Sequence, residues 1–129
     1  MLGLLDDPRG HALRAAATLM ALEAASLAVI ASLHLGHVLA GGKKPFRPTA
    51  AGIAEAIIGV VLLYGVGALL SRFPGGRRIA VATVLFAIAG FVLGLTFTLR
   101  GGDAVDIAYH ATLLPLLLVT LLLVLRRES

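Results

Sequence analysis

Four long apolar runs alternate with short polar connections along the chain. A bilayer core about 30 Å thick needs about 20 helical residues to cross it. Four segments reach that length, and they lie at approximately residues 12–40, 50–70, 79–99 and 106–125. The pattern therefore predicts an all-α integral membrane protein with four transmembrane helices.

The connections between these runs are rich in glycine and proline. They contain Gly41-Gly42, Gly75-Gly76 and Gly101-Gly102, with Pro45, Pro48 and Pro74 close by. Such residues end helices and allow tight turns. Because short connections make consecutive helices antiparallel, we expect an up-down-up-down four-helix bundle. Residues 1–129 would then form a single transmembrane domain.

The first run begins with a signal for a helix. Asp7 precedes Pro8, and a capping carboxylate followed by proline is typical of a helix start. The run is longer than the roughly 7–15 apolar residues of a secretory signal peptide. We therefore expect the first helix to remain in the mature protein.

Composition agrees with a membrane protein. Apolar residues make up 59% of the chain and charged residues 14%, against about 45–50% and 25% in soluble domains. The mean hydropathy is +0.99. Soluble enzyme classes are largely excluded by this balance. The absence of cysteine also excludes disulfides, thiolate nucleophiles and iron–sulfur clusters.

Basic residues divide unequally between the two ends of the predicted bundle. One end carries seven: Arg9, Arg14, Arg72, Arg77, Arg78, Arg126 and Arg127. The other end carries four: Lys43, Lys44, Arg47 and Arg100. The positive-inside rule then places both termini in the cytoplasm, and we expect a multi-pass protein of a prokaryotic plasma (inner) membrane. Since these residues flank spans beside anionic lipid, the sequence pI of about 10.4 does not indicate nucleic-acid binding.

Ionisable side chains are costly inside membrane spans and usually face the interior of a bundle. Away from their ends, the predicted spans contain Glu23, His34, His37, Glu55 and His110. At about 1.5 Å per residue, His34, Glu55 and His110 share one depth near the non-cytoplasmic end. Asp106 and His37 lie about one turn nearer that surface. We expect His34, Glu55 and His110 to converge.

This polar layer has the donors of a metal site. The spacings His34-x-x-His37 and Asp106-x-x-x-His110 each place both side chains on one helical face. The expected ligands are His34, His37, Glu55, Asp106 and His110, with Thr96 and Tyr109 supporting them. Nitrogen and oxygen donors without cysteine suit zinc, iron, copper or manganese. The same residues can instead form a purely structural cluster, with His34 hydrogen-bonded to a carbonyl or to Glu55.

Haem b is an alternative cofactor for the same layer. Histidines from two helices can clamp a haem iron, as His34 or His37 could with His110. Small residues would leave room for the macrocycle, and basic residues would pair with its propionates. These residues are Gly36, Gly90 and Gly94 for the space, and Lys43, Arg47 and Arg100 for the propionates.

Gly90 and Gly94 also belong to a stripe of small residues on the third predicted helix, together with Thr83, Ala87 and Thr98. Such stripes let helices approach closely. The stripe can serve packing within the chain, a homo-oligomer, or docking to a larger membrane complex.

Glu23 lies deeper, toward the cytoplasmic half of the first span. It resembles the lone acidic residue that small proton-coupled exporters carry in a first helix. The resemblance is one of architecture, because the chain has no tryptophan to line a cavity for a lipophilic cation. We expect Glu23 to be neutral and hydrogen-bonded to a neighbouring helix.

The sequence carries no catalytic signature such as a Walker loop or HExxH, and binding is favoured over catalysis. Metal-assisted hydrolysis of a lipid-borne substrate ranks below binding. Three functions remain: binding or transfer of a metal or haem, an accessory subunit of a larger membrane complex, and a small proton-coupled transporter.

Overall fold

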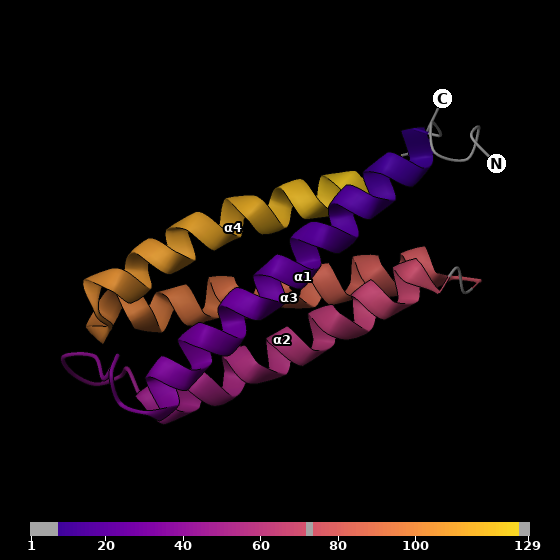
Figure 1. Cartoon of the computed structure of the whole chain (residues 1–129). Helices are drawn as coiled ribbons and strands as arrows, with labels where there is room; N and C mark the ends of the chain where they lie inside the picture. The colour runs from indigo at the N-terminus through magenta and orange to yellow at the C-terminus, as the bar shows by residue number, and fades with distance from the viewer. Residues whose placement is uncertain (1–7, 72–73, 127–129) are drawn as a thin grey trace.

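The computed structural model describes residues 8–71 and 74–126, and the four elements in them are helices. They are α1 (Pro8–Leu35), α2 (Pro48–Leu70), α3 (Gly76–Gly101) and α4 (Ala104–Leu125). Each is long and apolar enough to cross a membrane. Figure 1 shows the chain reversing direction at every connection, so that consecutive helices run antiparallel.

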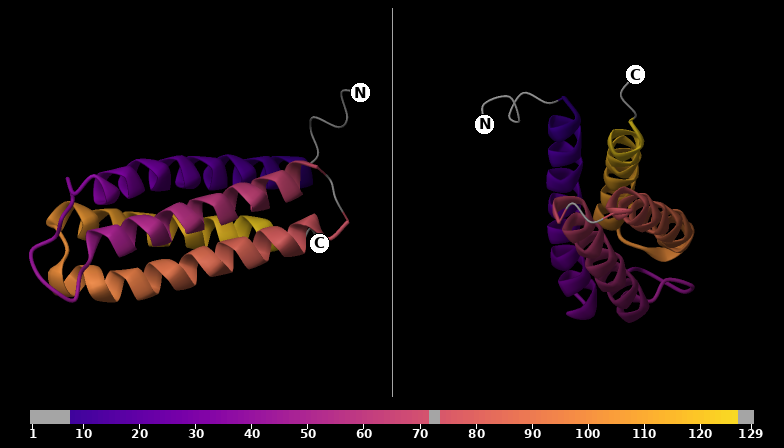
Figure 2. Two further views of the ribbon diagram at one scale, coloured as in Figure 1. Left: turned by 90° about the horizontal axis from the view of Figure 1, so that it is seen from below. Right: turned by 90° about the vertical axis from the view of Figure 1, so that its right-hand side faces the viewer.

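Each helix packs against two others. α1 contacts α2 and α4, and α3 contacts the same two helices. The helices thus close into a ring in chain order, which the two views of Figure 2 show from the side and along the bundle. Buried apolar side chains from all four helices fill the centre, among them Met20, Leu27, Leu62, Val84, Phe91 and Leu117.

Large apolar side chains also cover the outside of the bundle. Leu22, Val29, Val60 and Leu122 are each at least 62% exposed. In water such a surface would be unfavourable, whereas lipid chains are as apolar as these side chains. The outer surface therefore suits contact with a lipid bilayer.

α1 ends at Leu35, so the predicted span to residue 40 is wrong at its C-terminal end. The turn that ends it is a Schellman motif. The backbone N–H groups of His37 and Val38 donate to the carbonyls of His34 and Leu33, at 3.0 and 2.9 Å. His37 occupies the left-handed position of this motif, with a φ of 56°. Because glycine usually occupies that position, and apolar residues continue beyond it, the sequence pattern missed this helix end.

The other predicted spans lie within α2, α3 and α4. The carboxylate expected to cap α1, that of Asp7, lies outside the described residues. Asp103 precedes α4 without capping it. Its Oδ2 instead accepts a hydrogen bond of 3.0 Å from the backbone N–H of Gly41.

Glycines set the close approaches between neighbouring helices. A Cβ atom on Gly52 would lie 2.7 Å from Cγ of Leu35 and 3.0 Å from the backbone oxygen of Ala31, so α1 and α2 are nearly in backbone contact there. A Cβ on Gly90 would lie 2.7 Å from Cδ1 of Ile58. A Cβ on Gly94 would lie 3.2 Å from Nε2 of His110. Gly90 and Gly94 thus accommodate side chains of this chain.

The connection between α1 and α2 lies over one end of the bundle. It is tied to the C-terminal end of α3 by a 2.7 Å hydrogen bond from the N–H of Gly42 to the carbonyl of Gly101. Phe46, within this connection, turns inward and is 7% exposed. The bundle is therefore covered at the end where the polar layer was predicted.

Candidate metal centre

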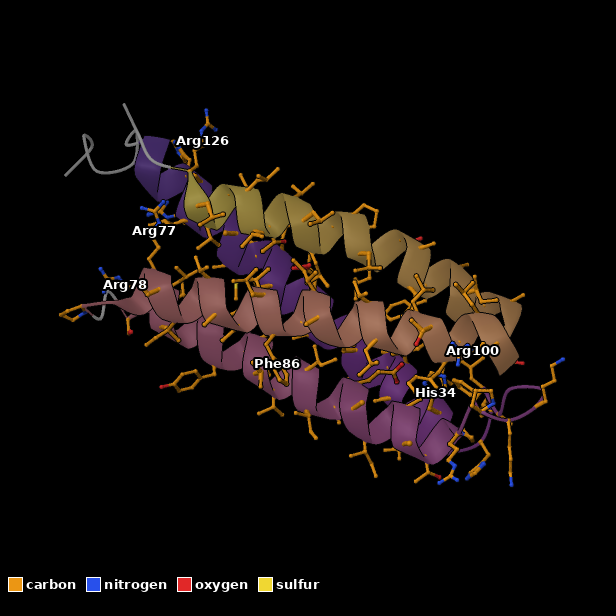
Figure 3. The ribbon with its side chains drawn as sticks, turned by 180° about the vertical axis from the view of Figure 1, so that it is seen from behind. His34, Arg77, Arg78, Phe86, Arg100 and Arg126 are labelled. Atoms are coloured by element: carbon orange, nitrogen blue, oxygen red, sulfur yellow. The ribbon has the colours of Figure 1, made fainter. Side chains whose placement is uncertain are left out.

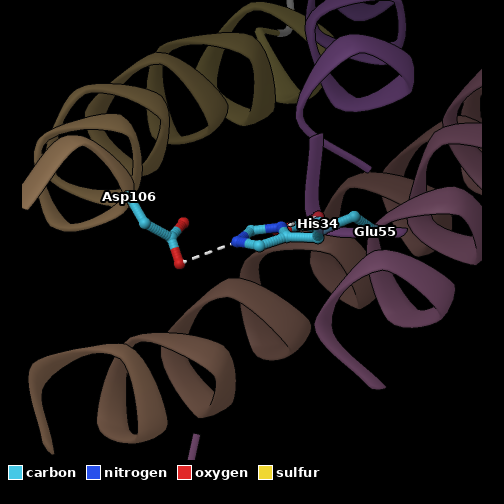
Figure 4. A group of neighbouring side chains, drawn as sticks. All are labelled: His34, Glu55 and Asp106. Carbon is cyan, nitrogen blue, oxygen red and sulfur yellow. Dashed lines mark hydrogen bonds and ion pairs between the residues drawn. The ribbon is translucent and has the colours of Figure 1, made fainter. Parts of the chain in front are cut away.

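The imidazole ring of His34 lies between two carboxylates from two other helices. Its Nδ1 is 2.7 Å from Oε2 of Glu55 on α2, and its Nε2 is 3.1 Å from Oδ2 of Asp106 on α4. Figure 4 shows the ring between the two acids. His34 and Asp106 are fully buried and Glu55 is 5% exposed. Three helices thus contribute to one buried cluster, made of His34, Glu55 and Asp106, which we call the His34 group.

Asp106 occupies the place that the sequence pattern predicted for His110. Since α1 ends at Leu35, His34 lies in its last turn. Asp106 lies in the first turn of α4, at the same level. The prediction that Asp106 lies a turn nearer the surface than His34 is therefore wrong, because it rested on a longer first helix.

His110 joins this group through Asp106. Its Nδ1 lies 2.9 Å from the backbone oxygen of Asp106 and 3.2 Å from Oδ1 of the same residue. Because a carbonyl oxygen only accepts hydrogen bonds, Nδ1 of His110 carries a proton. Its Nε2 lies beside Gly94 on α3. The structure thus places the free ring nitrogen of His110 away from His34.

In the described part of the chain, Oδ1 of Asp106 is the one buried side-chain oxygen without a well-directed hydrogen bond, although Nδ1 of His110 lies 3.2 Å from it. Its other oxygen, Oδ2, faces His34 and also lies 3.4 Å from the hydroxyl of Thr98. Thr98 lies on α3 and is 2% exposed, and its hydroxyl is hydrogen-bonded to Asp106. Thus α3 contributes Thr98 to the surroundings of Asp106.

Three of the predicted site residues lie apart from the His34 group. His37 lies beyond the end of α1 and is exposed. Thr96 is exposed, and its hydroxyl donates to the backbone oxygen of Leu93 at 2.6 Å. Tyr109 is half-buried, with its hydroxyl 2.8 Å from that of Ser26 on α1.

The haem arrangement does not fit the positions of these residues. Both ring nitrogens of His34 face carboxylates, and Nδ1 of His110 is bonded to a carbonyl. The space beside Gly90 and Gly94 is taken by Ile58 and by His110 itself. Lys43, Arg47 and Arg100 are exposed, and Figure 3 shows Arg100 at the end of the bundle where His34 lies.

Phe46 is a neighbour of the site that the sequence pattern did not reveal. Its ring centroid lies 5.6 Å from that of His34, at an interplanar angle of 54°. A Cβ on Gly41 would overlap the Phe46 ring, and Gly41 has a φ of 74°, so this position requires glycine. Phe46 lies in the irregular connection between α1 and α2. Because this segment has no helical spacing of apolar residues, the sequence pattern does not predict that its side chain points inward.

Glu23 lies apart from the His34 group, in the middle of α1. It is 3% exposed, and its Oε1 accepts a hydrogen bond of 3.0 Å from the hydroxyl of Thr120 on α4. Tyr64, which lies at a similar depth on α2, is 67% exposed. The neighbouring helix that bonds Glu23 is thus α4.

His34, Glu55 and Asp106 together meet the distance requirement for a metal site. One possible ligand atom from each lies within 4.8 Å of the others. One nitrogen and two carboxylate donors suit borderline and hard metal ions such as zinc, iron(II) and manganese. Comparisons with known proteins returned no match among family models, curated proteins or solved structures.

Proposed function

We propose that this chain is an integral protein of a plasma (inner) membrane that binds a divalent transition-metal ion at His34 and Asp106. In this proposal the chain crosses the bilayer four times as an up-down-up-down bundle. Both termini lie in the cytoplasm, and the metal site lies near the non-cytoplasmic face.

The distribution of charge supports this orientation. Figure 3 shows Arg77, Arg78 and Arg126 at the end of the bundle opposite to Arg100. With the basic residues of the two termini, that end carries the larger number of Lys and Arg. Since cytoplasmic loops carry the excess of basic residues, the end with Arg100 and His34 faces away from the cytoplasm.

The carboxylate of Asp106 is the observation that carries the metal proposal: its Oδ1 accepts no well-directed hydrogen bond among the described residues, and its Oδ2 faces Nε2 of His34. A buried carboxylate oxygen without a partner is costly in an apolar bundle, and a cation beside it offsets this cost. The N–H of Nδ1 of His110 is shared with the backbone oxygen of Asp106, at 2.9 Å, and Oδ1 lies 3.2 Å from the same nitrogen without a well-directed hydrogen bond. A metal ion would give it a partner and would bring a positive charge to a group with two acids.

The geometry of the His34 ring indicates which residues would hold the ion. The two ring nitrogens point in opposite directions, so one can bind the ion while the other donates its N–H to an acid. Glu55 is the closer acid, at 2.7 Å, and it would accept the N–H of Nδ1. An acid in this role orients the ring and raises its basicity.

Asp106 would then share the ion with Nε2 of His34. The Asp106 side of the ring carries more donors than the Glu55 side. Both oxygens of Asp106 and the hydroxyl of Thr98 lie on this side, where Oδ2 of Asp106 is 3.1 Å from Nε2 of His34 and 3.4 Å from the Thr98 hydroxyl. Phe46 covers this group from the loop side and keeps it out of water.

Zinc binding by the purified protein in detergent tests the proposal. His34→Ala should abolish high-affinity zinc binding measured by titration calorimetry. His37→Ala is the matched control, because His37 is exposed and lies beyond α1. Equal zinc binding by the His34→Ala variant and the unaltered protein would reject the site.

A further inference from the structure

The contact between α1 and α4 holds a second buried acid, remote from the His34 group. Glu23 on α1 faces Thr120 on α4, and the two are 3% and 0% exposed. The Thr120 hydroxyl lies 3.0 and 3.3 Å from the two carboxyl oxygens of Glu23. At about 1.5 Å per residue, Glu23 lies about 16 Å from His34 along α1.

The Thr120 hydroxyl has one hydrogen to donate and two acceptor groups within reach, the Glu23 carboxyl group and the backbone carbonyl of Leu116. It lies 3.0 Å from Oε1 of Glu23 and 2.9 Å from the backbone oxygen of Leu116. A hydroxyl can donate one hydrogen bond and accept two. Its direction of donation therefore depends on whether the carboxyl group of Glu23 is ionised or protonated.

Both protonation states of Glu23 are satisfied by this arrangement. With an ionised carboxylate, the hydroxyl of Thr120 donates to Glu23. With a protonated carboxyl, Glu23 donates to the oxygen of Thr120, which turns its own hydrogen to the carbonyl of Leu116. Loss of a hydrogen-bond partner destabilises a buried polar group, and Glu23 and Thr120 keep their mutual hydrogen bond in both states.

Among the residues that the structure describes, the groups on the other helices provide no counter-ion for Glu23. α4 carries Asp106, Tyr109 and His110 as ionisable residues. Of these, Tyr109 is bonded to Ser26, whose own hydroxyl donates to the backbone oxygen of Glu23 at 2.7 Å. α2 carries only Glu55 and the exposed Tyr64 as ionisable residues, and α3 carries none between Arg78 and Arg100. Of the described basic residues, none forms an ion pair with Glu23.

We propose that Glu23 and Thr120 form a reversible proton-binding site in the middle of the bundle, independent of the metal site. The carboxylate of Glu23 takes up a proton from water and forms the neutral acid, and it returns the proton to water on release. Thr120 changes from donor to acceptor at each uptake. The site gives the bundle a proton-exchanging group of the kind that proton-linked membrane proteins require.

Infrared difference spectroscopy of the whole protein in lipid vesicles, recorded over a range of pH, tests this proposal. The unaltered protein should show a carboxylic-acid band that grows as the pH falls, and Glu23→Gln should lack it. Thr120→Ser keeps the hydroxyl and should retain the titration. Thr120→Val removes the hydroxyl at similar size and should abolish the change over the same pH range.

Two results would overturn the proposal: a set of titrating bands that Glu23→Gln leaves unchanged, or a Thr120→Val variant that titrates as the unaltered protein does. Thr120→Val could fail to fold, which a loss of helical circular dichroism would show. The comparison of the unaltered protein with Glu23→Gln then tests the proposal, because Gln can keep the hydrogen bond to Thr120 and so preserve the fold. Asp106→Asn should retain the Glu23 band, so a failure of metal binding would be distinguished from a failure of this site.

Discussion

Nε2 of His34 and Oδ2 of Asp106 lie 3.1 Å apart, although the two residues are separated by 72 positions in the chain. His34 is in the last turn of α1 and Asp106 in the first turn of α4. This contact joins the first and last helices of the ring at its loop-covered end. A metal ion shared by these two residues would strengthen the same link.

Variants of the two acids beside His34 should differ in their effect on zinc binding. Glu55→Gln should weaken the affinity by about 10–100-fold, because an acid that orients a ligand contributes about this much. Asp106→Asn should abolish binding, because it removes the charge of a ligand. Titration calorimetry of the purified variants measures both effects. The reverse order of effects would place the ion on the Glu55 side of the ring.

The absence of cysteine allows a direct test of orientation. Lys43→Cys and Arg78→Cys each introduce one thiol at an exposed position at opposite ends of the bundle. A membrane-impermeant thiol reagent added to intact cells should label the variant at 43 and label the variant at 78 only after lysis. Labelling of the variant at 78 in intact cells would place the metal site on the cytoplasmic side.

Gly52 and Gly67 on α2 form a matched pair for the packing of α1 against α2. Gly52→Val should destabilise the bundle by about 1–3 kcal/mol, since its side chain would meet Leu35 and the backbone of Ala31. A Cβ on Gly67 meets nothing within 4 Å, so Gly67→Val has only the helix-propensity cost that both variants share. Unfolding in mixed micelles with increasing dodecyl sulfate measures the difference. Equal stability of the two variants would contradict the close approach at Gly52.

Tyr109 and Tyr64 form a second matched pair, because Tyr109 bonds Ser26 and Tyr64 is 67% exposed. Tyr109→Phe should cost about 0.6 kcal/mol, the average for an interhelical hydrogen bond in a membrane protein. Tyr64→Phe should leave the stability unchanged. The same unfolding assay compares them, and an equal loss in both would show that the bond to Ser26 contributes nothing.

The apolar runs alone predicted the four helices, because span length depends only on the thickness of the bilayer. The inward direction of His34 and Glu55 followed from the cost of ionisable groups in spans. The sequence pattern put His34 and Asp106 in one site but about a turn apart in depth, because their direct contact depends on a helix end formed by His37 in a left-handed conformation. Phe46 was missed for a related reason: the direction of a side chain in an irregular connection depends on long-range contacts such as Gly42 with Gly101.

Elemental analysis of the purified protein, beside its Asp106→Asn variant, tests the metal site most directly. Both proteins should be prepared in parallel, with circular dichroism to show equal helix content. We predict about one zinc, iron, copper or manganese ion per chain in the unaltered protein and none in the variant. A metal content that is equal in the two folded proteins, including none in both, would contradict the proposed site.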